Sequence, residues 1–288
     1  MPGTVRGFRE ERMTTALRPL STGELLDRTF SLYRDHFGLF IGIFALPHLI
    51  VFLFQLGGVV LQTSSGNELS RALIMMFSGF GVLILTVIVS AASQAGTVVA
   101  VSNVYLDRPA SISDSFSKVK GEILGVIGVS MLVGLGVAVG AIALIIPGII
   151  LLTMWSLSVP VKILEGKGVT DSMTRSSDLT KGDRWRVFLV WLLFAILSVG
   201  FAMLLQWPVE IAAGVTSRGA LARTSAGWQT LSLASQFVSE CLVGPLGTIA
   251  FCLIYYDERV RKEAFDLDLM MATLDTPAIP APAVQAGA

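Results

Sequence analysis

Charged residues are scarce in this chain of 288 residues, at 15% of the total, against about 25% in soluble domains. The formal net charge is zero, so no basic surplus points to a nucleic-acid partner. Cysteine and histidine number two each, too few for a metal site of the usual thiolate and imidazole type. Cys241 and Cys252 share one apolar stretch, about 16 Å apart on a helix and beyond disulfide reach. The sequence therefore predicts no metal and no cofactor.

In place of charge the chain has long apolar runs. Three stretches of 32 to 39 residues contain no Asp, Glu, Lys or Arg: His36–Asn67, Ala72–Leu106 and Ile123–Val161. A fourth, Val187–Val209, has 23 residues, and a fifth, Thr224–Tyr256, is interrupted only by Glu240. Because about 20 apolar residues cross a bilayer core of roughly 30 Å, we expect an all-α, polytopic membrane protein.

The number of spans depends on the stretch Ile123–Val161, which is nearly twice as long as one crossing needs. Pro147 and Gly148 lie within it, a pair that interrupts helices and permits turns. We predict two spans, residues 122–146 and 149–164, joined by that turn; the second is short for a full crossing. The total is six transmembrane helices arranged as three hairpins.

The basic residues support this count. With six spans, 18 of the 21 Lys and Arg residues fall on one side of the membrane, and only Arg71, Arg218 and Arg223 fall on the other. Positive charge stays with the cytosol, so both termini are expected to be cytoplasmic. A single crossing by residues 123–161 would move the loop that carries six basic residues to the outside.

Similar polar segments precede the predicted hairpins. Residues 18–24 parallel 108–114 at an offset of 90, and residues 113–118 parallel 170–175 at an offset of 57. Each of the first two segments contains a serine followed three residues later by an acid, a pattern that caps helices. Apolar residues follow at helical spacing: Leu26, Phe30, Tyr33 and Phe37 in the first, and Ile112, Phe116, Val119 and Ile123 in the second. The third copy has a poorer stripe. We predict three units, each a cytoplasmic amphipathic helix before a hairpin; unrelated capped helices would give a similar pattern.

Four polar residues within the apolar runs are intramembrane candidates: Glu240, Gln55, His48 and Gln94. An acid inside a span suggests a functional site. A carboxyl group that is neutral or paired within the bundle is the interpretation we favour for Glu240, with Gln55 at a similar depth as a hydrogen-bond partner. Gln94 belongs to a polar stripe with Ser90 and Thr97, typical of contacts between helices but also compatible with a water-lined path.

The last span continues into Tyr255-Tyr256-Asp257-Glu258-Arg259-Val260-Arg261-Lys262-Glu263-Ala264-Phe265-Asp266-Leu267, with opposite charges four residues apart. This segment resembles the end of the membrane domain of bacterial glycerophosphoryl diester phosphodiesterases, in its stand-alone form. Residues 20–27, 105–109, 147–148, 164–166 and 175–186 match the same family, although Ala264 and Asp107 stand where it often has Gly. The resemblance covers Arg18 to Met271. It implies a six-helix domain in the bacterial inner membrane, of no settled activity.

The sequence predicts no catalysis, because it has no nucleophile elbow, phosphate-binding loop or zinc-protease motif. We expect a protein that organises membrane lipid or a protein partner through its cytoplasmic face; the alternative is a small-molecule or ion transporter. Three regions are predicted: a flexible cytoplasmic N-terminus (1–17), a membrane domain (18–271) and a disordered cytoplasmic tail (272–288). The candidate residues at the cytoplasmic face are Glu165, Arg175, Lys181, Arg184, Asp257, Arg259 and Arg261.

Overall fold

A computed structural model describes residues 20–216 and 225–263, and the side chains of all of these except 213–216. These residues are almost entirely helical and contain no strand, which confirms the all-α prediction. They belong to two compact units, Ser21–Tyr255 and a smaller one made of Leu20 with residues 256–263. The predicted flexible N-terminus, the predicted tail and residues 264–271 of the predicted membrane domain lie outside the described residues.

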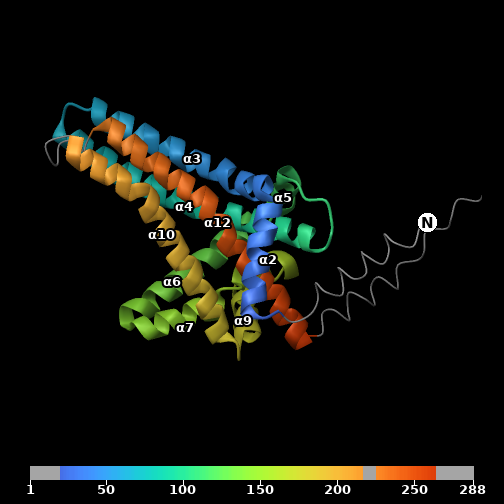
Figure 1. The fold of residues 1–288 in the computed structure, drawn as a ribbon. Coiled ribbons are helices and arrows are strands. Elements are labelled where there is room, and N and C mark those ends of the chain that lie inside the picture. Colours follow the sequence, from blue (N-terminus) through green and yellow to red (C-terminus); the bar gives the residue numbers. More distant parts are fainter. Residues whose placement is uncertain (1–19, 217–224, 264–288) are drawn as a thin grey trace, which may run out of the picture. The chain divides into compact units, whose positions relative to one another are not determined.

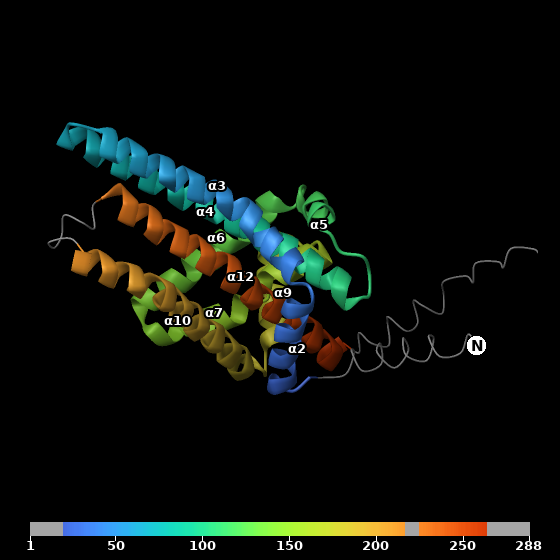
Figure 2. The same cartoon turned by 45° about the horizontal axis from the view of Figure 1, so that its top comes forward.

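Six helical stretches of the described chain are long and apolar enough to cross a membrane. They are α3 (Phe37–Ser64), α4 (Glu68–Tyr105), α6 (Ile123–Ala143), α7 with α8 (Ile145–Trp155 and Ser158–Glu165), α10 (Arg184–Thr216) and α12 (Ala226–Glu263). Three shorter helices precede pairs of these: α2 (Thr22–Asp35), α5 (Ile112–Val119) and α9 (Val169–Thr180). Helix α3 lies along α4, and α6 along α7 (Figures 1 and 2). The multi-pass membrane class is thus supported.

The long apolar stretch contains a chain reversal, but not at the predicted place. Helix α6 ends at Ala143 and is capped by Leu144, and Pro147 and Gly148 lie in the first turn of α7. Proline fits a first helical turn because its missing N–H would be unpaired there anyway. Gly148 is needed for a close approach, since a Cβ atom on it would lie 2.8 Å from the backbone nitrogen of Ala141. The glycines of α6 face α7 too, because Cβ atoms on Gly136 and Gly140 would meet Trp155 and Gly148.

A second proline lies just after a second interruption, where the backbone of Leu157 (φ −94°, ψ 5°) is not extended like that of Leu144 (φ −163°, ψ 143°). Leu157 precedes α8 as Leu144 precedes α7, and Pro160 takes the third helical position just as Pro147 does. Two backbone groups beside the interruption, the Met154 carbonyl and the Leu157 N–H, bind a side chain of another helix. Ser176 of α9 serves both sides, because its hydroxyl donates to the Met154 carbonyl at 2.8 Å and accepts from the Leu157 N–H at 3.1 Å. Helix α9 therefore completes the broken span.

The second half of α4 is the centre of the larger unit. Its side chains are buried almost continuously from Val89 to Asn103, whereas only 6% of its most apolar window is buried. Helices α3, α5, α6 and α8 pack on α4, and one cluster joins Ala91, Ala95 and Val99 to Val119 of α5 and Val126 of α6. Small side chains permit this close packing. Protein–protein packing is therefore concentrated at one end of the span.

The buried faces of α2, α5 and α9 differ from the predicted apolar stripe. Helix α2 buries Leu25, Thr29 and Leu32, while Phe30 and Phe37 of the predicted stripe are 43% and 47% exposed. The buried positions nevertheless coincide at the offsets of 90 and 57 residues. The coinciding sets are Leu25, Ser115 and Ser172, then Thr29, Val119 and Ser176. Each helix thus turns a face that mixes aliphatic residues with Ser or Thr to protein.

Replacing Ser176 with Ala should destabilise the protein by about 1–3 kcal/mol. The substitution leaves the buried Leu157 N–H unpaired, and the Met154 carbonyl keeps only the Thr180 hydroxyl at 3.4 Å. The neighbouring Ser177, which makes no side-chain hydrogen bond in the described structure, is the matched control, and Ser177→Ala should change stability by less than about 0.5 kcal/mol. Chemical unfolding in detergent measures both. Equal effects of the two substitutions would contradict the role given to Ser176.

Tyr33 anchors α2 to α12, since its hydroxyl donates to the Leu242 carbonyl at 2.8 Å. Burial, and next the neighbouring Cys241, raise the pKa of Tyr33 from 10.0 to about 12. A phenol whose pKa is raised on folding stabilises the fold fully below the unfolded value and loses that contribution as pH rises from 10.0 towards 12.

The unfolding midpoint of the native protein should therefore fall as pH rises from 10.0 to about 12. In Tyr33→Phe this fall should be smaller, because one group that ionises on unfolding is gone. Thermal unfolding followed by circular dichroism across this range tests the difference. Parallel curves for the two proteins would show that Tyr33 does not contribute.

Candidate functional site

Polar side chains from three spans meet inside the apolar part of the larger unit. A cavity of about 90 Å³ lies between α3, α4 and α12, and its polar lining residues are His48, Gln55, Thr86, Gln236 and Glu240. The aromatic pair Phe52 and Phe237, with ring centroids 5.2 Å apart, also borders it. Three of the four predicted intramembrane candidates are thus brought together. Gln94 lies half-buried on α4, eight residues beyond Thr86, and does not line this cavity.

Hydrogen bonds fix the groups of this cavity. The Nε2 atom of His48 lies 4.0 Å from a carboxyl oxygen of Glu240, and the other carboxyl oxygen accepts from the Gln236 amide at 3.1 Å. The Nδ1 atom of His48 lies 2.8 Å from the Phe44 carbonyl oxygen and 3.4 Å from the Ser93 hydroxyl. The partners of Glu240 are therefore a histidine and its own helix neighbour, and the predicted bond from Gln55 is not among those described.

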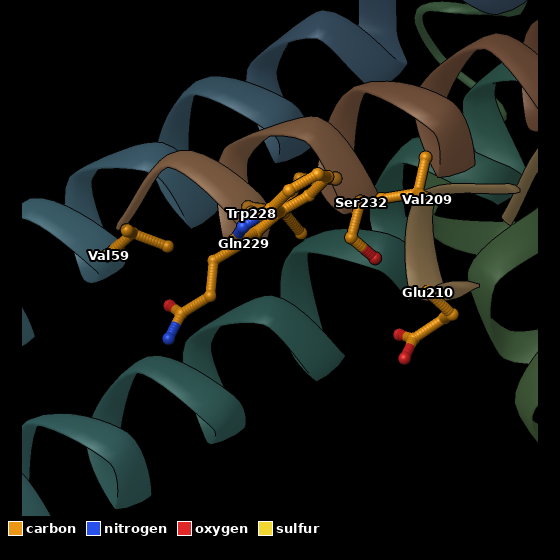
Figure 3. A pocket seen from close by; sticks show the side chains of 7 residues that line it. Val59, Val209, Glu210, Trp228, Gln229 and Ser232 are labelled. Carbon is orange, nitrogen blue, oxygen red and sulfur yellow. The ribbon is translucent and has the colours of Figure 1, made fainter. Parts of the chain in front are cut away.

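A second cavity of about 240 Å³ lies between the last turns of α3 and α10 and the first turns of α12. Figure 3 shows Trp228, Gln229 and Ser232 of α12 with Val59 of α3 and Glu210 of α10. Sequence reasoning missed these residues, because Gln229 and Ser232 are common in helices. Their spacing carries the signal: Gln229, Ser232, Gln236 and Glu240 lie on one face of α12.

Glu165 is the centre of an ion-pair cluster at the opposite end of the spans. Its side chain is only 12% exposed. It accepts from both Arg175 (two contacts of 3.2 Å) and the buried Tyr255 hydroxyl at 3.0 Å, and Lys167 lies 3.1 Å away. The cluster joins α8, α9 and α12. Two predicted cytoplasmic-face residues, Glu165 and Arg175, are thus used to hold helices together.

The smaller unit contains the predicted pairs at the end of α12. Asp257 with Arg261, Glu258 with Lys262 and Arg259 with Glu263 lie within 2.8–3.1 Å, which confirms the i, i+4 prediction. Asp257 and Arg261 also bind the Leu20 backbone, through its N–H and its carbonyl. The side chains of Asp257 and Glu258 are fully buried, so this is not the exposed helix end that the charge pattern alone would suggest.

The start of α10 differs from the other basic positions because it combines cations with aromatic surface. Trp185 is 70% exposed and packs against Phe188 with ring centroids 5.4 Å apart. Lys181 is exposed beside it, and the buried Nε atom of Arg184 has no hydrogen-bond partner among the described residues. Further along α10, the buried Phe194 packs against Phe30 of α2, which is 43% exposed. We call Phe30, Lys181, Arg184, Trp185 and Phe188 the aromatic–basic surface.

No family model, curated protein or solved structure matches this chain. The resemblance to the phosphodiesterase membrane domain therefore stays a prediction. Within the described residues, no three His, Cys, Asp or Glu side chains form a group that could hold a metal ion.

Glu165→Gln should cost about 2–3 kcal/mol of stability, because Arg175 and Lys167 lose their shared counter-charge in a partly buried place. Glu263→Gln removes one partner of a more exposed pair within α12 and should cost less than about 1 kcal/mol. Denaturant unfolding in one detergent compares the two. A larger loss in Glu263→Gln would contradict the structural role of the Glu165 cluster.

Proposed function

We propose that this chain is a non-enzymatic, multi-pass membrane protein that organises anionic lipid at its cytoplasmic face. The observation that carries the proposal is the aromatic–basic surface. An indole that is 70% exposed follows Arg184 in α10, and the exposed Lys181 lies three residues before Arg184, in the linker from α9. Tryptophan prefers the headgroup level of a bilayer, and nearby cations attract anionic headgroups.

The topology proposed with this function is three hairpins, each preceded by an amphipathic helix, with both termini in the cytoplasm. The coinciding buried positions of α2, α5 and α9 support the three units. The asymmetry of 18 against 3 basic residues supports the orientation. The family resemblance supports a bacterial inner membrane as the location. In this arrangement, α2 lies along the interface with Phe30 and Phe37 towards lipid.

Lipid is the partner that the surface chemistry fits best. In the span windows of α3, α4, α6 and α10, between 6% and 28% of the residues are buried, so acyl chains are the neighbours of most of their side chains. At the cytoplasmic end, the exposed Lys181 and the guanidinium charge of the half-buried Arg184 attract the phosphate of an anionic headgroup. Other predicted face residues, Glu165, Arg175, Asp257, Arg259 and Arg261, hold the fold through the ion pairs described above.

The double variant Lys181→Gln with Arg184→Gln should bind anionic phospholipid about 30-fold less tightly, since each near-surface cation contributes about 1 kcal/mol. Competition between phosphatidylglycerol and phosphatidylcholine for the detergent-solubilised protein, read by native mass spectrometry, measures this preference. Trp185→Ala should weaken retention of both lipids, because it removes interfacial contact without changing charge.

Arg71→Gln is the control, because Arg71 is exposed at the end of the bundle where α4 begins and its Nε donates to the Ser65 carbonyl. This variant should retain lipid as the native protein does. Equal preference for the two phospholipids in the native protein, or retention of a protein partner without lipid, would overturn the proposal.

Transport of an ion or small molecule is a second candidate function, favoured by the polar cavity of His48, Gln55 and Glu240 within the bundle. Solute uptake by proteoliposomes that is lost in Glu240→Gln, while lipid preference is unchanged, would establish transport instead.

A further inference from the structure

We propose that His48 and Glu240 form a proton-binding pair inside the bundle, reached from the second cavity along the polar face of α12. The site takes a proton from hydronium and releases water, so the exchange needs no other reactant. This inference goes beyond the proposed function, because it holds whether or not the protein gathers lipid at its other end.

The hydrogen bonds of His48 set the proton count. A carbonyl oxygen only accepts, so the Nδ1 atom that lies 2.8 Å from the Phe44 carbonyl carries a hydrogen. The Nε2 atom faces Glu240 at 4.0 Å. A lone pair on Nε2 facing a carboxylate would be repulsive, so the pair is stable with one further proton, on either Nε2 or the carboxyl group. A second proton would place an imidazolium beside a neutral carboxyl group, and the ionic attraction between the two groups would be lost.

Few other charges compete for this proton. Helix α3 contains no charged residue, and those of α4 lie at its first turn, at Glu68 and Arg71. The polar groups around the pair are the Gln55 amide from α3, the Ser93 and Thr86 hydroxyls from α4 and the Gln236 amide from α12. Cys241 follows Glu240, and Tyr33 of α2 binds the Leu242 carbonyl nearby. The histidine and the carboxyl group are therefore the two ionisable groups that face each other at this point.

The two cavities supply a route to the pair. Gln229 and Ser232 line the larger cavity, and Gln236 and Glu240 line the smaller one. These positions follow one another by three, four and four residues on one face of α12 and extend over about 16 Å of helix. From α3, Gln55 and His48 lie on the same cavity wall, and Val59 borders the larger cavity. Amide and hydroxyl groups at each turn can hold the waters that move a proton.

Two measurements of the full chain in lipid vesicles across a pH titration test the pair. They are infrared difference spectra and solid-state ¹⁵N NMR spectra of protein with labelled histidine. The C=O band of a protonated carboxyl group and the ¹⁵N signal of the His48 ring should change over the same pH interval. Glu240→Gln should remove that band and move the midpoint of the ring signal by about one pH unit or more. His48→Gln should move the midpoint of the band and abolish the ring signal.

Two variants serve as controls for assignment. Glu210→Gln, in the larger cavity, should leave the coupled transition in place, and His36→Gln removes the only other histidine without affecting it. A band that persists in Glu240→Gln, or a ring signal whose midpoint is unchanged in that variant, would overturn the proton-binding pair.

The route has its own readout. After a rapid pH change on the side of the larger cavity, Ser232→Leu should slow the appearance of the carboxyl band and leave its midpoint where it is, because an apolar side chain interrupts the polar face. Thr230→Leu, at an exposed position of α12 that lines neither cavity, is the matched control. Equal rates in the native protein and Ser232→Leu would overturn the route, and a shifted midpoint would show that Ser232 acts on the pair itself.

Discussion

Every backbone N–H and C=O group within the hydrocarbon region needs a partner inside the protein, and much of this structure follows from that need. It accounts for the absence of strands among the described residues and for the way the prolines are placed. Pro147 and Pro160 sit in first helical turns. At the second interruption, the Ser176 hydroxyl donates to the Met154 carbonyl and accepts from the Leu157 N–H. The Tyr33 hydroxyl and the His48 ring bind carbonyl groups of the spans in the same manner.

Packing is unevenly distributed along the spans. The second half of α4 is enclosed by protein and the first half is not. The ion pairs of Glu165, and of Lys162 with Glu122 at 2.6 Å, lie at the enclosed end. Lipid-facing surface and protein-facing surface are thus assigned to different lengths of the same helices. In such a membrane protein, contacts between helices are concentrated at one end of the spans, and lipid surrounds the other end.

The sequence was sufficient for features that depend on local composition. Uncharged length predicts the six spans, and charge spacing predicts the pairs of Asp257, Glu258 and Arg259. It placed the chain reversal three residues late, because a Pro-Gly pair suits a first helical turn as well as a loop. The position of Glu240 and Gln55 in their spans predicts that they lie at a similar depth. It does not identify His48 as the partner of Glu240, because that contact depends on how α3 and α12 are rotated about their axes. The Tyr255 bond to Glu165 spans 90 residues and has no local signal.

Helix α4 is a single rod of 38 residues without proline, about 57 Å long. Val82 and Thr86 border the small cavity, and Asn103 near the other end reaches Asp114 of α5 at 3.4 Å. A stiff rod cannot absorb a tilt locally, so a change of angle at one end displaces the other in proportion to its length. A tilt of α4 at Thr86 would therefore also displace the helices that lie against Asn103.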